Sequence, residues 1–273
     1  MGKEEEALNL FLTENIVEAG RITENLNKYN RDRQEVEKRI FEEAISKIEK
    51  YHLDKNNVIV LGAENWHHGV IGIVASKITE LYFKPSILIC FEGDEGKGSG
   101  RSIPGFDLHG ALCKSSEYLE KYGGHEMAVG LSLKKKNFKK FAEKFEEIAE
   151  KAHTEEIESV INIDKEITLK DVNFETVKSL KALEPFGEAN KLPVFIYKNL
   201  KIDSIRALSE GKHLKLTLKD GNNILNSIGF NMGKYAEEFK IGDKIDVLGV
   251  LETNVFNGVE MLQFNMKDIR RSY

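Results

Sequence analysis

The chain has 273 residues, enough for one large domain or two ordinary ones, and its 41% hydrophobic and 31% charged residues are typical of globular proteins. A net charge of −5 argues against a protein that coats nucleic acid non-specifically, because such binding depends on lysine and arginine. The acidic excess lies in residues 1–160, with 23 basic and 29 acidic residues, whereas residues 161–273 have 17 and 16.

Membrane and secretory signals are missing from the sequence. No apolar run is long enough to cross a bilayer, and no signal-peptide pattern opens the chain. Cys90 and Cys113 lie in apolar or helical contexts and are interpreted as reduced core thiols. We therefore expect a cytoplasmic protein.

The first part of the chain predicts a long helical segment and then an α/β domain. Residues 4–51 follow a helical pattern almost free of breakers, which predicts an amphipathic connector. Apolar runs at 58–61 and 86–91 predict buried strands, and the helix expected over 70–82 suggests that they pair in parallel. Further expected elements are a strand or loop at 96–102, helices at 107–122 and 138–151 capped by Asp107 and Asn137, and a strand at 128–133.

The second part is mostly β. Strands are expected at 160–167, 193–205, 212–219, 223–230, 244–252 and 259–269, with helices near 173–182 and 233–239. Asp220-Gly221-Asn222-Asn223 and Asn257-Gly258 are strong hairpin turns. Short strands with one inserted helix favour a small barrel, most often an OB-fold. The predicted fold class is thus a mixed α/β sheet with flanking helices, followed by an all-β OB-fold-like barrel, after a long N-terminal connector helix.

Three glycine-punctuated motifs in the α/β domain could bind an anion. They are "WHHGVIG" at a strand-to-helix junction, "KGSGRS" with its arginine fork, and the turn "GGHEMAVGL". The candidate residues are Trp66, His67, Ser99, Gly100, Arg101, Ser102, Gly123, Gly124 and His125. All three motifs flank strands of one predicted sheet, so we expect them to converge on one edge of it.

Each motif also has a plainer interpretation. The glycines can simply form flexible turns, and His67-His68 can belong to a Trp-capped turn. Two adjacent histidines could bind a metal, but no carboxylate or cysteine lies at a recognised spacing. The sequence also has no string of paired aspartates, no Walker loop and no nucleophile elbow. His109 and Cys113 lie four residues apart and are interpreted as packing residues.

These motifs, in this order and spacing, resemble the DHH-associated domain of the RecJ single-strand-specific exonucleases. "LEPFGEANKLPVF" (183–195), "KHLKLTL" (212–218), "IGFNMG" (228–233) and "LQFNMKDIR" (262–270) resemble the OB-fold domain of that family, and "LNKYNRDRQEVEKRIFEEA" resembles its connector. The resemblance implies connector helices over 1–52, a DHH-associated substrate-binding domain over 53–152, a linker over 153–160 and an OB-fold domain over 161–273. One departure is Val129, which stands where the family motif more typically has alanine.

The resemblance also implies a function. It implies the substrate-binding half of a 5′-to-3′ single-stranded-DNA exonuclease of recombination and repair. The catalytic DHH domain, which holds Mn²⁺ or Mg²⁺, would lie N-terminal to this chain, so the chain alone should neither bind metal nor hydrolyse DNA. Ser99 and Arg101 match positions that hold the 5′ phosphate, and Gly123, Gly124 and His125 match the substrate loop. Trp66 and His67 match a motif at the same cleft.

In the OB domain, aromatic stacking and lysine contacts would hold the strand further along. Candidates are Phe195, Tyr197, Lys215, Phe230 and Phe256, of which about half should instead be buried, since alternate residues of a barrel strand fill its core. Expected partners are single-stranded DNA and, as further candidates, a single-strand-binding protein or a helicase; a monomer is expected. The alternatives are a DHH-family phosphodiesterase for short oligonucleotides or cyclic dinucleotides, a non-catalytic single-strand-binding module, and a structural protein that docks through its acidic helix face.

Overall fold

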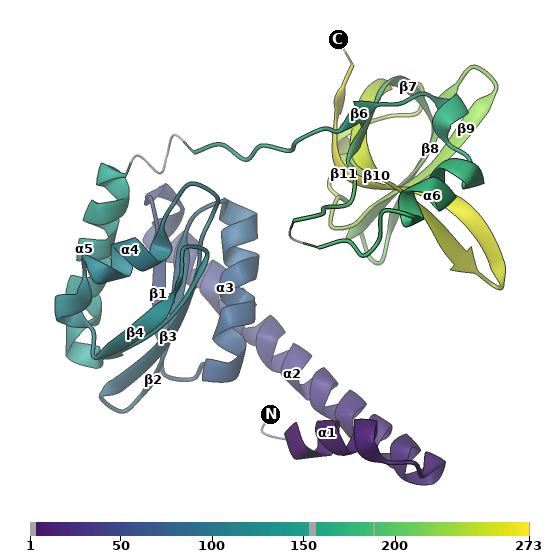
Figure 1. Ribbon diagram of the computed structural model, residues 1–273. Coiled ribbons are helices and arrows are strands. Elements are labelled where there is room, and N and C mark those ends of the chain that lie inside the picture. The colour runs from purple at the N-terminus through teal and green to yellow at the C-terminus, as the bar shows by residue number, and fades with distance from the viewer. Residues whose placement is uncertain (1–3, 153–156, 188, 273) are drawn as a thin grey trace. The chain divides into compact units, whose positions relative to one another are not determined.

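The computed structural model describes residues 4–152, 157–187 and 189–272, and the chain divides into two compact units, Met1–Ser159 and Val160–Tyr273 (Figure 1). None of the helices in these described ranges is long and apolar enough to span a membrane. Part of the expected linker, residues 153–156, lies outside the described residues.

The predicted N-terminal helical segment forms two helices, α1 (Glu4–Leu12) and α2 (Ile16–Tyr51). The break between them occurs at Asn15, whose side chain accepts hydrogen bonds from the main-chain N–H groups of Val17 and Glu18 and so begins a new helix. The C-terminal part of α2 buries a stripe of apolar side chains at a spacing of four residues: Ile40, Ala44 and Ile48.

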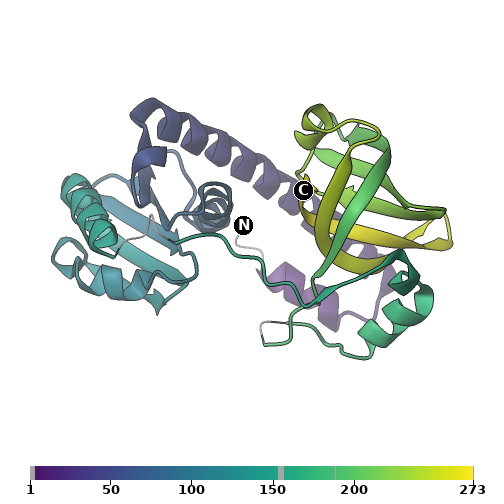
Figure 2. The same ribbon diagram turned by 90° about the horizontal axis from the view of Figure 1, so that it is seen from above.

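The rest of the first unit is a five-stranded sheet of order β1-β2-β3-β5-β4 with helices on both faces. The strands are β1 (Ile59–Ala63), β2 (Ser86–Glu92), β3 (Glu95–Arg101), β4 (Lys121–His125) and β5 (Ala128–Lys134). The helices are α3 (His68–Tyr82), α4 (Leu108–Cys113) and α5 (Phe138–Lys151). As predicted, β1 and β2 are parallel; the other pairs are antiparallel. Figure 2 shows α5 and α2 on opposite sides of the sheet.

Two hydrophobic clusters attach these helices to the sheet. One joins α2 and α3 to β1 and β2 through residues such as Ile48, Val74 and Leu88. The other joins α4 and α5 to the opposite face, through residues such as Phe141 and Leu131. The two helical layers therefore cover different faces of one sheet.

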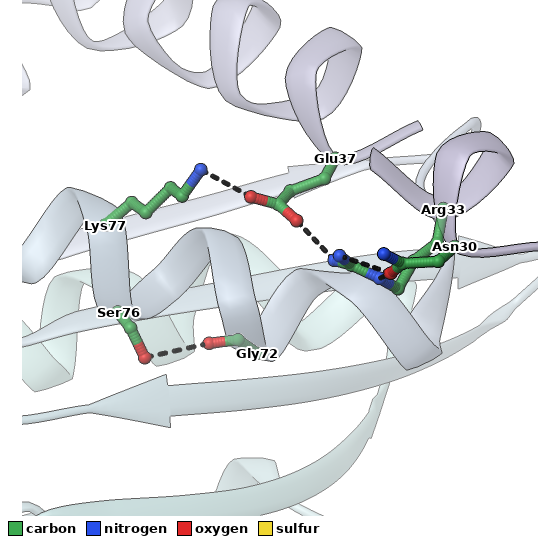
Figure 3. A network of polar contacts seen from close by, with 6 residues as sticks. All are labelled: Asn30, Arg33, Glu37, Gly72, Ser76 and Lys77. Atoms are coloured by element: carbon green, nitrogen blue, oxygen red, sulfur yellow. Dashed lines mark hydrogen bonds and ion pairs between the residues drawn. The ribbon is translucent and has the colours of Figure 1, made fainter. Parts of the chain in front are cut away.

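A polar network also fixes α2 against α3 (Figure 3). Glu37 of α2 is only 7% exposed, and its carboxylate forms ion pairs with Arg33 of α2 and Lys77 of α3. Burial alone would raise the pKa of Glu37, but the hydrogen bonds from Lys77 and Arg33 outweigh burial and lower it. Glu37 is therefore an ionised, partnered side chain that joins two helices.

Several local predictions for this unit are wrong. The helix expected over 107–122 ends at Cys113, because the buried Ser115 hydroxyl donates to the carbonyls of Ala111 and Leu112 and competes with further helix. Asn137 occupies the N-cap position of α5, but its side chain donates to the Tyr118 carbonyl instead of capping the helix. Cys113 is exposed, whereas Cys90 is buried as predicted.

The second unit is a closed barrel in which each strand pairs with the next in the order β7-β8-β9-β11-β10, and β10 pairs again with β7 (Figure 1). Its strands are β7 (Phe195–Leu208), β8 (His213–Asp220), β9 (Asn223–Gly229), β10 (Lys244–Phe256) and β11 (Val259–Arg271). Strand β9 pairs with β11 in parallel, and the other barrel pairs are antiparallel. This is the five-stranded Greek-key barrel of the OB-fold.

The smaller elements of the second unit agree with most predictions. Both hairpin turns lie where expected, and so do α6 (Phe174–Lys181) and α7 (Tyr235–Glu238). The strand expected over 160–167 is reduced to β6 (Lys165–Glu166), which pairs with the start of β7.

Candidate nucleic-acid interface

One face of the first sheet is only half covered by helices. Where α2 and α3 cover β1 and β2, the alternate residues of this face are buried, as with Leu61 and Leu88. On β3, β5 and β4 the same face carries only exposed or half-buried residues. We call this surface the open face; its residues are Glu95, Lys97, Ser99, Arg101, Lys121, Gly123, His125, Ala128, Gly130, Ser132 and Lys134.

The strand register places two of the predicted motifs directly opposite each other on the open face. Arg101 of β3 pairs with Ala128 of β5, which pairs with His125 of β4. Ser99 is likewise aligned with Gly130 and Gly123. Two inter-strand spacings separate the outer members of each row, so they lie about 10 Å apart. The structure therefore brings the "GSGR" and "GGH" motifs onto one surface.

The third motif does not meet the other two at one edge of the sheet, contrary to expectation; it reaches them over the face of the sheet, where its Gly72 lies against Ser99 and Arg101. Strand β1 ends at Ala63, which is aligned with Cys90 and Lys97, and α3 begins just beyond this end. Arg101 and His125 lie at the opposite end of the strands, about 13 Å away along β3. The candidate residues are thus spread along a face of the sheet.

The glycines of β3 have a different role from the predicted one. Strand β3 pairs on both edges, with β2 and with β5, so its backbone cannot form an anion nest. Gly100 is buried on the face away from the open face, and an added Cβ would lie 2.8 Å from a methyl of Val129 and 3.1 Å from Ile87. Gly98 is packed in the same way against Ile89 and Leu131. These glycines let the α4 and α5 layer approach the sheet.

Ser99 and Arg101 form the polar centre of the open face. The Arg101 Nη1 group donates to the Gly100 carbonyl at 2.8 Å and to Ser99 Oγ at 3.2 Å, which folds the guanidinium back over β3. Gly72 of α3 lies directly against both side chains, since an added Cβ would be 3.0 Å from Ser99 Oγ and 3.3 Å from Arg101 Nη2. The guanidinium is half-buried and held in place, with further N–H groups to offer an anion.

Edge strand β4 supplies exposed backbone beside this centre. It is the last strand of the sheet, and all five of its residues are exposed. An added Cβ at Gly123 of β4, or at Gly130 of the neighbouring β5, would meet no atom within 4 Å. The "GGH" stretch is therefore a strand and not the predicted turn, which instead occupies Glu126 and Met127. His125 Nδ1 accepts a long hydrogen bond of 3.4 Å from the Met127 N–H, which leaves Nε2 as a donor.

Trp66 and Ser102 are not available to a ligand, contrary to expectation. Trp66 is 6% exposed, and its indole N–H donates to Glu43 of α2 at 3.0 Å. Ser102 is also 6% exposed, and its hydroxyl donates to the Phe106 carbonyl at 2.7 Å. Both side chains are structural. His67 is half-buried, and its Nδ1 caps α3 by accepting from the Gly69 N–H.

Sequence reasoning did not select two lysines of the open face, Lys97 and Lys121. Both are exposed, and neither forms an ion pair with a described residue. The alternation of polar and apolar residues along β5 marks one face of it as solvent-accessible. Only the pairing of β4 with β5 places Lys121 on that face.

Two of the five barrel candidates are buried. Phe195 and Tyr197 are 7% and 2% exposed and belong to the barrel core, where Tyr197 packs edge-on against Phe264. Burial raises the pKa of Tyr197. These two residues cannot stack on bases, which corrects the expectation for them. The side chain of Phe256 lies outside the described residues.

Lys215 and Phe230 are exposed at the face formed by β8 and β9, which is the face where OB-folds bind their ligands. Lys215 contributes to a groove of about 480 Å³. The groove is lined by Leu208, Lys215, Asn226, Ser227, Ile228, Asn254, Met261, Leu262 and Gln263. Phe230 is 51% exposed and packs edge-on against His213 of β8. The aromatic ring of Phe230 and the ammonium of Lys215 are therefore accessible on the same side of the barrel.

Among the described residues, no group of three or more histidine, cysteine, aspartate or glutamate side chains could hold a metal ion. The donor set of these residues therefore does not fit a divalent metal centre.

Comparison with known families identifies both units. The DHHA1 domain family matches residues 55–151, and the RecJ OB domain family matches residues 163–268. These matches define the chain as a DHHA1 domain followed by a RecJ OB domain.

Relatives and solved structures agree over nearly the whole chain. The single-stranded-DNA-specific exonuclease RecJ of Bacillus subtilis is 31% identical over 96% of this chain and 34% of its own length. The Escherichia coli protein of the same name is 29% identical over 95% of this chain and 47% of its own length. A crystal structure of Thermus thermophilus RecJ with Mn²⁺ superposes with a TM-score of 0.81 at 27% identity, covering 100% of this chain and 39% of that one.

The chain belongs to the RecJ family and corresponds to the C-terminal part of these relatives. It spans between about a third and a half of their length.

Proposed function

We propose that this chain is the substrate-binding part of a RecJ-type exonuclease that acts on single-stranded DNA from its 5′ end in recombination and repair. The observation that carries the proposal is the open face, where a fixed arginine, two lysines that form no ion pair with a described residue, and two glycines with open space above them lie on one surface. Such a surface suits a phosphate group close to the backbone. The names of the relatives support single-stranded DNA as the polymer.

The two units have separate roles in this proposal. The 5′ phosphate is bound by Arg101, Ser99 and His125. The backbone of β4 at Gly123 and Gly124 lies along the bound DNA. In the barrel, Phe230 stacks on a base and Lys215 contacts the backbone. The bound strand is thereby positioned, and proton transfer and bond cleavage belong to the rest of the enzyme.

The chemistry of hydrolysis is assigned to a region outside this chain. Related RecJ structures contain Mn²⁺ or Mg²⁺, and divalent ions of this kind are the proposed cofactors of the complete enzyme. The cytoplasm, where bacterial DNA lies, is the proposed location. A single-strand-binding protein or a helicase is a further proposed partner, and the protein is proposed to be a monomer.

Substitution of Arg101 tests the phosphate site. Arg101→Ala should weaken binding of a 5′-phosphorylated single strand about tenfold, which corresponds to ~1.4 kcal/mol and to the loss of a charge-assisted hydrogen bond. Fluorescence anisotropy at fixed salt measures the affinity. Lys140→Ala is the matched control, because it removes an exposed charge from α5, which packs on the other face of the sheet.

The outcome separates the proposal from the alternatives. If Arg101→Ala has no effect but Phe230→Ala weakens binding, the chain is a non-catalytic single-strand-binding module. If the unaltered chain binds no single strand, a structural or partner-docking role is favoured. A preference for di- and trinucleotides over longer strands would favour a phosphodiesterase for short oligonucleotides.

A further inference from the structure

A second polar basin lies on the outside of the barrel, at the seam where β10 closes on β7. It has a volume of about 610 Å³ and is lined by Lys198, Asn199, Lys244, Asp246, Arg270 and Ser272. Three of these side chains are cationic and one is anionic, so the lining has a net charge of +2. All six are polar, in contrast to the partly apolar groove beside Lys215.

Asp246 lies at the bottom of this basin, and both oxygens of its carboxylate accept hydrogen bonds. It is 6% exposed and accepts hydrogen bonds from Ser272 Oγ at 2.6 Å, the Asn199 N–H at 3.1 Å and Arg270 Nε at 3.0 Å. Its negative charge is therefore used to hold Arg270 at the rim. The β-bulge between Ile245 and Val247 creates this arrangement, because it sets Asp246 opposite the Lys198-Asn199 step of β7.

Two lysines at the seam face each other across the strand pair. Lys244 of β10 pairs directly with Lys201 of β7, both are exposed, and neither forms an ion pair with a described residue. Like charges directly opposite each other on neighbouring strands are destabilising. An anion bound between them would relieve this repulsion, whereas the Lys198 ammonium is already 2.6 Å from Glu166.

The seam lies far from the groove that contains Lys215. The groove contacts β10 at Asn254, ten residues beyond Lys244, which is roughly 30 Å along an extended strand. A ligand at the seam would therefore be a second contact and not an extension of the first. Polar, cationic surfaces without an apolar platform contact phosphates and do not read bases.

We propose that the seam patch, Lys201, Lys244 and Arg270, binds the phosphodiester backbone of single-stranded nucleic acid as a second site on the barrel. This inference rests on the proposed function, because it assumes that the barrel carries a single strand. It adds a sequence-independent contact for longer strands that reach past the groove.

The salt dependence of binding tests this site. Each phosphate contact to a single strand contributes about 0.7 to the slope of log K against log salt concentration. The double variant Lys201→Gln/Lys244→Gln should therefore lower the slope for a strand of about 30 nucleotides by about 1.4. For a strand of about eight nucleotides, within the site size of one OB-fold, the slope should not change.

Matched variants make the result specific. Lys170→Gln/Lys178→Gln removes the same charge from exposed positions near α6 and should leave both slopes unchanged. The seam variant should also unfold at an equal or higher temperature, because it removes a like-charge pair, so lost binding cannot be attributed to misfolding.

Two outcomes would contradict the inference in distinguishable ways. An unchanged slope for the seam variant on the long strand, with Phe230→Ala still weakening binding, would overturn the second site and leave the proposed function standing. Failure of the unaltered chain to bind either strand would overturn both.

Discussion

At the scale of single residues, Glu37 shows most clearly how a buried charge supports this fold. Its carboxylate is the only one in Figure 3, and it joins Arg33 on its own helix to Lys77 on α3. Because α3 also contacts Ser99 and Arg101 through Gly72, the position of α3 matters for the open face as well as for stability.

Glu37→Gln should lower the free energy of unfolding of the first unit by about 1–3 kcal/mol at pH 7, because two charged donors lose an ionised acceptor. The pKa of Glu37 is lowered in the folded protein from its usual 4.5. Its stabilisation is therefore present above pH 4.5 and is lost as the pH falls through the lower, folded pKa. The difference in the free energy of unfolding between the unaltered protein and Glu37→Gln should therefore become smaller as the pH falls through that range.

Urea unfolding followed by the fluorescence of Trp66, the single tryptophan of the chain, measures this difference. Glu42→Gln on the same helix is the control, because Glu42 is exposed and its nearest cation, Lys38, is 3.8 Å away. Equal losses from the two variants, or a difference that does not change with pH, would contradict the role given to Glu37.

At the scale of elements, β3 and β5 show that glycines in one sheet can serve opposite purposes. Gly100→Ala should lower the free energy of unfolding by about 1–3 kcal/mol, because its Cβ would overlap Val129 and Ile87. Gly130→Ala should leave stability equal or raise it by up to about 1 kcal/mol, since its Cβ meets open space.

The affinity for a single strand should be affected in the opposite way by these two variants. Gly130→Ala puts a methyl group on the open face and should weaken binding of a single strand, while folded Gly100→Ala protein should bind normally. Thermal unfolding and anisotropy of the same two samples provide the check. Normal binding by Gly130→Ala would argue against close approach of a phosphate to this strand.

The elements also show where sequence reasoning succeeds and fails. Apolar runs such as 86–91 and hairpin turns such as Asn257-Gly258 are local signals, and the predicted strands and turns are confirmed there. Glycine favours turns, so the sequence predicts a turn at Gly123-Gly124, but pairing with β5, a tertiary contact, makes this segment a strand. Burial of Phe195 and Tyr197 likewise depends on which face of β7 closes on the barrel core.

The structure agrees with the surface position of some predicted site residues and not of others, since Trp66 and Ser102 are buried. Ser99, Arg101 and His125 do lie on one accessible surface, as the motifs suggested. The expected convergence of all three motifs on one edge is wrong, because β3 runs antiparallel to β2 and places Arg101 at the end of the sheet opposite to the end of β1. Helix α3 reaches Arg101 over the face of the sheet, through Gly72. A linear motif does not contain that change of direction.

At the scale of the whole molecule, the proposed function gives the surfaces of the two units different contacts to one polymer. The open face of the first unit suits a terminal phosphate, and the barrel offers a groove with an aromatic neighbour and a cationic seam. The overall charge of −5 does not conflict with this, because Lys97, Arg101 and Lys121 lie on the open face and three cationic side chains line the basin at the seam.

The most direct test of this account is the affinity of the unaltered chain for a short labelled single strand with a 5′ phosphate, compared with the same strand ending in a 5′ hydroxyl. Fluorescence anisotropy at low and moderate salt provides both values. We predict tighter binding of the phosphorylated strand, with the difference abolished by Arg101→Ala. Equal, salt-sensitive binding of both strands would contradict a 5′-phosphate site on the open face.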